Sequence, residues 1–138
     1  MAQTVGEIMT TDVVTVQFEA TVLEAAQLMR DEDIGDVVVM QDDKTVGILT
    51  DRDIVVRVVA EGKDFNTTVS EIASHSLTTV SSETDIDDAI DLMGDEAIRL
   101  LPVVDNGRLV GILSLGDLAI DEDETSALSE ISTAPPNN

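Results

Sequence analysis

One pattern occurs twice in this chain, and that repeat limits the fold more than any other feature. When the sequence is shifted by 64 residues, 5–53 aligns with 69–117 without a gap, and 18 of the 49 aligned positions are identical. Many other aligned pairs exchange one apolar residue for another. A single unit of this size buries too little surface to be robust, so the two copies are expected to fold as one module.

Each copy is predicted to fold as βαββα, because strand-like apolar runs alternate with helical periodicity. The first copy is expected to have strands at 13–16, 37–41 and 45–49, a helix after Thr21, and a second helix over 53–61 ending at Gly62. In the second copy the strands are expected at 77–80, 101–105 and 108–113, with helices after Asp85 and over 117–120. Thr21 with Glu24 predicts a capping box, Asp85 with Asp88 a weaker one, and Asn106–Gly107 a tight hairpin turn.

These elements predict an α+β fold in which two repeats are expected to pack through their sheets into one pseudo-two-fold module. The expected boundaries are 1–62 for the first repeat, 63–68 for a linker, 69–121 for the second repeat and 122–138 for an acidic, Pro/Asn-containing tail.

Acidic side chains dominate the charge, with 29 Asp and Glu against 7 Lys and Arg and a formal net charge of −22. Such a surface repels phosphate backbones and anionic lipid, which argues against nucleic-acid and membrane partners. It fits either an ordinary acidic, soluble surface or a protein adapted to a high-salt cytoplasm, where screening weakens repulsion between acids. The start of the chain lacks the pattern of a secretory signal, so a cytoplasmic location is expected.

Two corners between a strand and a helix carry the candidate site. Thr50 and Asp53 are three residues apart, as are Ser114 and Asp117, and both pairs follow Gly-Ile-Leu. In the simplest interpretation each pair only caps its helix. The alternative is that a carboxylate in the first turn also accepts hydrogen bonds from vicinal hydroxyls, while the helix terminus favours a phosphate.

The two runs Gly47–Asp53 (GILTDRD) and Gly111–Asp117 (GILSLGD) resemble the most specific motif of the CBS (cystathionine β-synthase-type) domain family. The segment 101–105 (LPVVD) looks like the central strand of that family, and Val38 stands in the first copy where proline is common. The resemblance extends over about residues 4–120 and leaves no part of the chain for a catalytic domain. It implies a stand-alone CBS pair that binds AMP, ADP, ATP or S-adenosylmethionine as a regulatory ligand.

The resemblance also implies residue roles and partners. Asp53 and Asp117 would hold ribose hydroxyls, Thr50 and Ser114 would lie near a phosphate, and Ile48 and Ile112 would line the base pocket. Arg99 occupies a position where similar proteins often place a phosphate contact, and Arg52 lies inside the first motif; for each, the alternative is a surface ion pair. The clefts would lie between the copies, and ligand binding would change the orientation of the repeats or their contacts with a regulated protein.

An enzyme is not expected. The chain has no cysteine and a single histidine, and it lacks nucleophile, zinc-protease and P-loop patterns. The Asp-rich stretches lack the spacing of a calcium loop and are interpreted as solvated faces rather than metal sites. The competing hypothesis is a ligand-free interaction scaffold, because related pairs associate through their helices and Val55, Val56, Val58 and Val59 would suit a homodimer.

Overall fold

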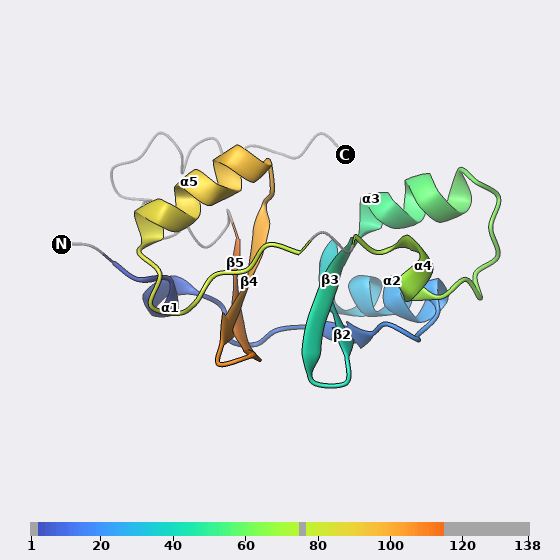
Figure 1. Ribbon diagram of the computed structural model, residues 1–138. Helices are drawn as coiled ribbons and strands as arrows, with labels where there is room; N and C mark the ends of the chain where they lie inside the picture. Colours follow the sequence, from blue (N-terminus) through green and yellow to red (C-terminus); the bar gives the residue numbers. More distant parts are fainter. Residues whose placement is uncertain (1–2, 75–76, 115–138) are drawn as a thin grey trace. The chain divides into compact units, whose positions relative to one another are not determined.

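The structure, a computed structural model, describes residues 3–74 and 77–114 (Figure 1). The described residues form two compact units. The first unit comprises residues 12–78 and 106–109, and the second comprises 3–11, 79–105 and 110–114. The second unit therefore combines the start of the chain with most of the second repeat.

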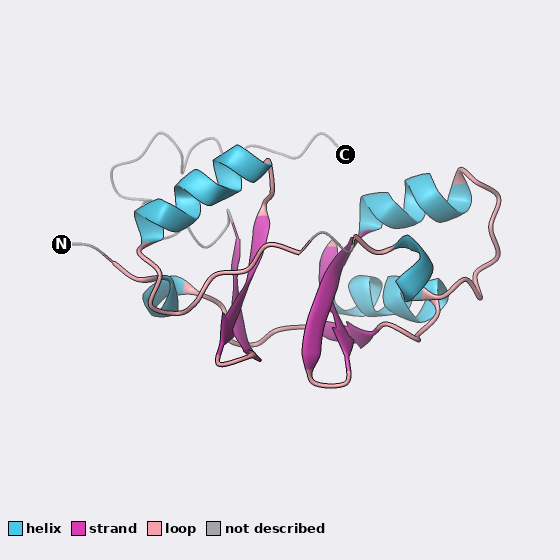
Figure 2. Ribbon diagram, viewed as in Figure 1, coloured by secondary structure: helices cyan, strands magenta, loops and turns pink. Residues whose placement is uncertain are grey.

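The first unit contains a three-stranded sheet with the order β1-β2-β3, and its helices α2, α3 and α4 lie together on one side of the sheet (Figures 1 and 2). Its elements are β1 (Thr15–Gln17), α2 (Val22–Glu32), β2 (Asp36–Gln41), β3 (Lys44–Thr50), α3 (Asp51–Ile54), η1 (Val55–Val59) and α4 (Val69–Ile72). β1 pairs in parallel with β2, and β2 pairs antiparallel with β3. The three predicted strands of the first copy are thus confirmed, with shifts of one or two residues at their ends.

The core of the first unit joins the sheet to all of its helices. Its buried residues are mostly valines, with Val37 and Val39 from β2, Leu49 from β3, Ala25 and Met29 from α2 and others from η1 and α4. The helix α2 begins as predicted, because Thr21 accepts a hydrogen bond from the Glu24 N–H at 3.2 Å and the Glu24 side chain returns to the Thr21 N–H. Burial of its apolar face then holds α2 against the sheet.

The second unit contains α1 (Val5–Ile8), α5 (Ile86–Glu96), β4 (Leu100–Asp105) and residues 110–114 of β5 (Arg108–Ser114). The hairpin predicted at Asn106–Gly107 is confirmed, since both residues have left-handed φ values of 52° and 79° as a tight β4–β5 turn requires. The strand predicted at 77–80 is wrong as a full strand, because only Val80 pairs, by a single parallel bridge to Val103. Asp85 does precede α5 as its N-cap, but its side chain makes no capping bond, so the weaker box is also wrong.

Two short helices were not predicted. Both begin with a threonine whose backbone N–H donates to a glutamate three residues on: Thr4 to Glu7 at 2.8 Å before α1, and Thr68 to Glu71 at 3.0 Å before α4. Val5 of α1 belongs to the core of the second unit, and Val69 and Ile72 of α4 belong to the core of the first. Each unit therefore contains one of these short capped helices.

The helix after β3 differs from the prediction for 53–61. It begins at Asp51, two residues earlier, because Thr50 is its N-cap. From Val55 to Val59 it widens into a π-helical turn, in which the Ala60 N–H donates to the Val55 carbonyl at 2.8 Å. Gly62 lies beyond it with a left-handed φ of 69°, as expected for a glycine at a helix end. The second-copy helix predicted over 117–120 lies outside the described residues.

Candidate functional site

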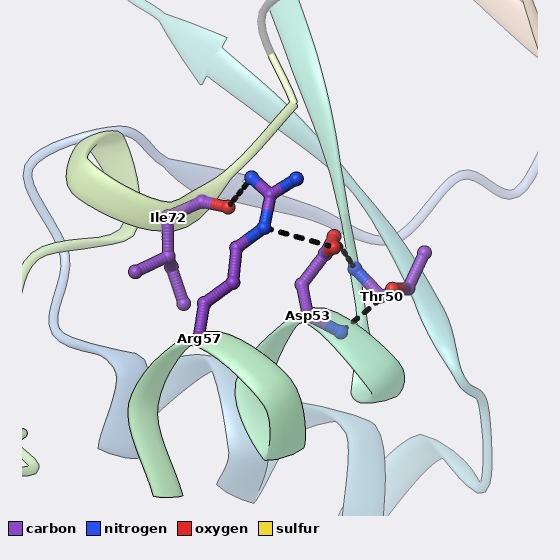
Figure 3. A network of polar contacts seen from close by, with 4 residues as sticks. All are labelled: Thr50, Asp53, Arg57 and Ile72. Carbon is purple, nitrogen blue, oxygen red and sulfur yellow. Dashed lines mark hydrogen bonds and ion pairs between the residues drawn. The ribbon is translucent and has the colours of Figure 1, made fainter. Parts of the chain in front are cut away.

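Thr50 and Asp53 form a reciprocal cap at the point where β3 turns into α3 (Figure 3). The Asp53 N–H donates to Thr50 Oγ1 at 3.0 Å, and the Thr50 N–H donates to Asp53 Oδ2 at 3.0 Å. The side chain of Asp53 is 18% exposed. Each carboxylate oxygen can accept two hydrogen bonds, so this carboxylate caps the helix and keeps acceptor capacity for another group.

Arg57 is a neighbour of Asp53 that sequence reasoning missed. Its Nε lies 3.9 Å from Asp53 Oδ1, and its NH1 group donates to the carbonyl of Ile72 at 2.9 Å (Figure 3). The signal in the sequence was an acid followed four residues later by a base on a predicted helix, a spacing that places the two side chains on one face. Arg57 links the corner at the end of β3 to the end of α4.

Ile48, the predicted base-pocket residue of the first copy, is half-buried in β3. Its backbone pairs with Ser74, with N–H to carbonyl distances of 3.4 and 3.1 Å in the two directions. The preceding residue, Gly47, has no side chain, and an added Cβ would collide with the Ser74 carbonyl oxygen. The glycine of the motif therefore lets the segment after α4 approach β3 closely.

The two predicted arginines differ in their surroundings. Arg52 is exposed on α3, one residue before Asp53, and makes no ion pair with any residue that the structure describes. Arg99 is exposed just before β4 and likewise has no ion pair among the described residues. The first-copy equivalent of Arg99 is Gly35, whose added Cβ would lie 3.0 Å from Asp51 Oδ2. At this position the first copy therefore has a carboxylate nearby in place of a cation.

The second motif is only partly described. Ser114 ends β5, and Ile112 is half-buried and pairs with Thr10 through two backbone hydrogen bonds of 2.9 Å. Gly111 again precedes a close approach, because an added Cβ would lie 2.8 Å from the Thr10 carbonyl oxygen. The strand part of this motif thus has the same pairing as in the first copy. Asp117, its predicted ribose ligand, lies outside the described residues.

Two carboxylates away from the corners have perturbed acidity. Two hydrogen bonds from Ser82, by its hydroxyl at 2.5 Å and its N–H at 2.9 Å, lower the pKa of Asp105 below its usual range. The pKa of Glu71 is lowered by hydrogen bonds from the backbone and side chain of Thr68 at the start of α4. Both shifts have structural causes in caps and turns.

Among residues 3–74 and 77–114, no three His, Asp or Glu side chains are grouped so that they could hold a metal ion. Within the same residues, no helix has the length and apolar character needed to cross a membrane.

The fold and the repeated motif define a class of protein: a tandem pair of repeats built from helices and strands, each carrying a Gly-Ile-Leu-Ser/Thr-x-x-Asp motif whose Ser or Thr ends a strand. The chain belongs to the CBS domain family, which matches residues 5–60 and 69–120. The resemblance stated from the sequence is confirmed, and so is the fold class of two such repeats built from helices and strands.

Known proteins of similar length match nearly the whole chain. The CBS domain-containing protein YhcV of Bacillus subtilis is 43% identical over 132 residues, which cover 93% of this chain and 94% of the relative. Hypoxic response protein 1 of Mycobacterium tuberculosis is 39% identical over 118 residues, covering 84% of this chain and 82% of the relative. The crystal structure of the CBS domain pair of protein MJ0100, in complex with 5′-methylthioadenosine and S-adenosyl-L-methionine, has a TM-score of 0.81 at 25% identity and covers 91% of this chain and 100% of that one.

Proposed function

We propose that this chain is a non-catalytic regulatory module that binds an adenosyl ligand through its strand-to-helix corners. The observation that carries the proposal is the carboxylate of Asp53, which Thr50 holds at a fixed position and which keeps free acceptor capacity at a partly exposed site. Two vicinal ribose hydroxyls are donors that suit such a carboxylate. The adenosyl ligands of the related MJ0100 pair support this ligand class.

Charge favours a ligand with few negative groups at the first corner. Asp51 and Asp53 lie in the first turn of the helix, and Asp51 lies beside Gly35 where the second copy has Arg99. The net charge of −22 adds to this local field. We therefore propose S-adenosylmethionine, 5′-methylthioadenosine or AMP at the first corner in preference to ATP.

The second corner is proposed as a separate, unequal site. Ser114 and Asp117 repeat the motif, and Arg99 supplies a cation that the first copy lacks. Arg99 would contact a phosphate in this site, whereas Arg52 would serve the first. Binding is proposed to act by differential affinity, favouring one arrangement of the repeats or one set of contacts with a regulated protein.

Isothermal titration calorimetry with AMP, ATP, 5′-methylthioadenosine and S-adenosylmethionine tests this function. Asp53→Asn keeps an acceptor for the Thr50 N–H but removes the charge, so it should weaken binding at the first corner about ten- to a hundredfold, equivalent to about 1.5–3 kcal/mol. The matched control is Asp43→Asn, which removes one charge from an exposed turn and should bind as the wild type does. Saturable binding that Asp53→Asn leaves unchanged would contradict the proposed corner.

A second candidate function is an interaction scaffold, and one observation favours it. Val55, Val56 and Val59 on η1 are 58%, 44% and 61% exposed, which leaves an apolar helix face without cover in the monomer. A homodimer that buries this face would explain it. If none of the four ligands gives a heat signal while sedimentation shows a dimer that Val59→Glu dissociates, the scaffold is the better account.

A further inference from the structure

A single guanidinium connects the candidate ribose ligand to a buried carbonyl. The NH1 group of Arg57 donates at 2.9 Å to the carbonyl of Ile72, a residue that is only 1% exposed and therefore gives a fixed anchor at the end of α4. From that anchor the Nε of the same side chain faces Asp53 Oδ1 at 3.9 Å. A planar guanidinium can make both contacts at once, because its donors have a fixed geometry.

We propose that Arg57 is a positioning residue that fixes the Asp53 carboxylate for a ribose diol and so sets the ribose selectivity of the first site; this rests on the proposed function. Thr50 holds Oδ2 from one side at 3.0 Å, and Arg57 attracts Oδ1 from the other (Figure 3). Rotation of the carboxylate is thereby restricted, and a group held in its working geometry binds better than one that must be ordered on contact.

The distance of 3.9 Å matters for this role. It is too long for a hydrogen bond, so Arg57 orients Oδ1 by charge without occupying its lone pairs. Oδ1 remains able to accept a hydrogen bond from a hydroxyl of the ligand. An arginine bonded directly to both oxygens would instead compete with the sugar.

Arg57 lies in the π-helical turn η1, and Val58, the next residue, is 1% exposed within the core of the first unit. The backbone that carries Arg57 is therefore fixed by packing as well as by its hydrogen bonds. Sixty-four positions later the second copy has Asp121, an acid in place of the base. The inference thus applies to the first site alone.

The test compares AMP with 2′-deoxy-AMP, because only the ribose form offers both hydroxyls to Asp53. Calorimetry at about 0.1 M KCl, where the screening length of about 10 Å leaves the attraction between Arg57 and Asp53 in place, gives the ratio of the two dissociation constants for the wild type, Arg57→Gln and Asp53→Asn. We expect Arg57→Gln to reduce the preference for ribose about three- to tenfold. The loss should come mainly from weaker binding of AMP, while the dissociation constant of 2′-deoxy-AMP changes little. A loss of structure alone would weaken both probes equally.

The control is Arg30→Gln, which removes the same charge from an exposed arginine on α2 that pairs with Asp31. Arg30→Gln should keep the wild-type preference for AMP over 2′-deoxy-AMP. If it lost as much of this preference as Arg57→Gln does, the cause would be a general charge effect and the inference would be overturned. If Arg57→Gln melts below the assay temperature, Arg57→Met takes its place, since methionine removes the charge and the donors while keeping an unbranched side chain, and the same loss of ribose preference is expected.

The two proposals fail in different ways. If Asp53→Asn loses the ribose preference and Arg57→Gln keeps it, the positioning role is refuted and the proposed function stands. If the wild type binds neither probe, or Asp53→Asn binds both as the wild type does, the proposed function of this corner fails and the role of Arg57 fails with it.

Discussion

The carboxylate of Asp53 accepts a hydrogen bond from the Thr50 N–H through one oxygen and faces Arg57 with the other. The two interpretations of this motif, a helix cap and a ligand contact, are therefore compatible. A cap fixes the side chain in one rotamer, and a fixed rotamer is what a binding carboxylate needs. The same pair of residues can stabilise the helix start and prepare the site.

Thr50→Ala should destabilise the fold, because it removes the hydroxyl that accepts from the Asp53 N–H at 3.0 Å. The expected cost is about 1 kcal/mol of unfolding free energy, as for other N-caps. Thr50→Ser keeps the acceptor and should stay close to the wild type. Chemical denaturation followed by circular dichroism measures both variants. Equal midpoints for Thr50→Ala and Thr50→Ser would show that the cap adds nothing.

The lowered pKa of Asp105 leads to a prediction about how stability depends on pH. Ser82 lowers its pKa in the folded protein relative to the unfolded value of about 3.9. A carboxylate with a depressed folded pKa contributes stability above its unfolded pKa, and this contribution is lost as the pH falls through the folded pKa. Ser82→Ala should therefore flatten the fall of the melting temperature below about pH 4.

Melting curves between pH 3 and pH 7 for the wild type, Ser82→Ala and Asp105→Asn decide this. Asp105→Asn cannot titrate at this position, so its melting temperature changes with pH only through the other carboxylates. If the melting temperature of Ser82→Ala falls with pH as steeply as that of the wild type, and more steeply than that of Asp105→Asn, the hydrogen bond from the Ser82 hydroxyl is not the cause.

At the level of residues, the motif letters predicted the cap at Thr50 and Asp53 because that interaction lies within one helical turn. The role of the Ile72 carbonyl could not be predicted, because a backbone group carries no signal in the sequence. Arg57 could have been selected from its spacing to Asp53, but its contact with Ile72 depends on where α4 packs. Local contacts are readable from the sequence, and those between distant segments are not.

The glycines that begin the two motifs lead to a prediction about how strands and neighbouring segments pack. Gly47 faces the backbone carbonyl of Ser74, and Gly111 faces that of Thr10. In each case the residue after the glycine pairs with the same facing segment. Gly47→Ala and Gly111→Ala should each cost about 1–3 kcal/mol of unfolding free energy, since the added methyl group must displace backbone. Thermal and urea unfolding measure this cost.

Gly94 is the matched control for these variants. It lies in α5 with no atom within 4 Å of an added Cβ. Gly94→Ala should stabilise the fold by up to about 1 kcal/mol, because alanine is the better helix former. If Gly47→Ala also stabilised the fold, the close approach of the segment after α4 to β3 would be refuted.

The longer elements and the short strand β1 were predicted correctly, whereas the short helices α1 and α4 were not. Both the helix α2 and the hairpin β2–β3 carry a periodic apolar pattern that local chemistry reinforces. The helices α1 and α4 have four residues each, too short for periodicity, although their Thr-x-x-Glu boxes were visible in the sequence. The π-helical turn in η1 had no signal, since a run of valines also fits an ordinary helix or a strand.

For the molecule as a whole, the sequence repeat and the compact units divide the chain differently. The repeat pairs α1 with the first copy's strands, yet α1 packs in the core with α5, β4 and β5. A shift of 64 residues aligns α1 with α4. The alignment of the two copies is therefore the same whether each short helix packs in its own copy's unit or in the other one. Internal repetition therefore reveals that two units exist, but not which short helix completes which unit.

The net charge of −22 on 138 residues leads to a prediction about salt. Folding brings the acids closer together, and their repulsion then opposes the compact state. Raising the salt from about 0.1 M to about 1 M shortens the screening length from about 10 Å to about 3 Å, so this penalty falls. The few ion pairs lose strength as well, but the described residues contain only Arg30–Asp31 and Arg57–Asp53, both with arginines more than half exposed.

The melting temperature should therefore rise with KCl, and the rise should be steepest below about 1 M, where screening changes most. Sucrose of equal osmolality is the control, because it stabilises by exclusion from the surface without screening charge. A rise in KCl that exceeds the rise in sucrose assigns the effect to acidic repulsion. A melting temperature that stays flat or falls as KCl increases would mean that the acids lie far enough apart to tolerate one another, and that the charge serves solubility rather than adaptation to salt.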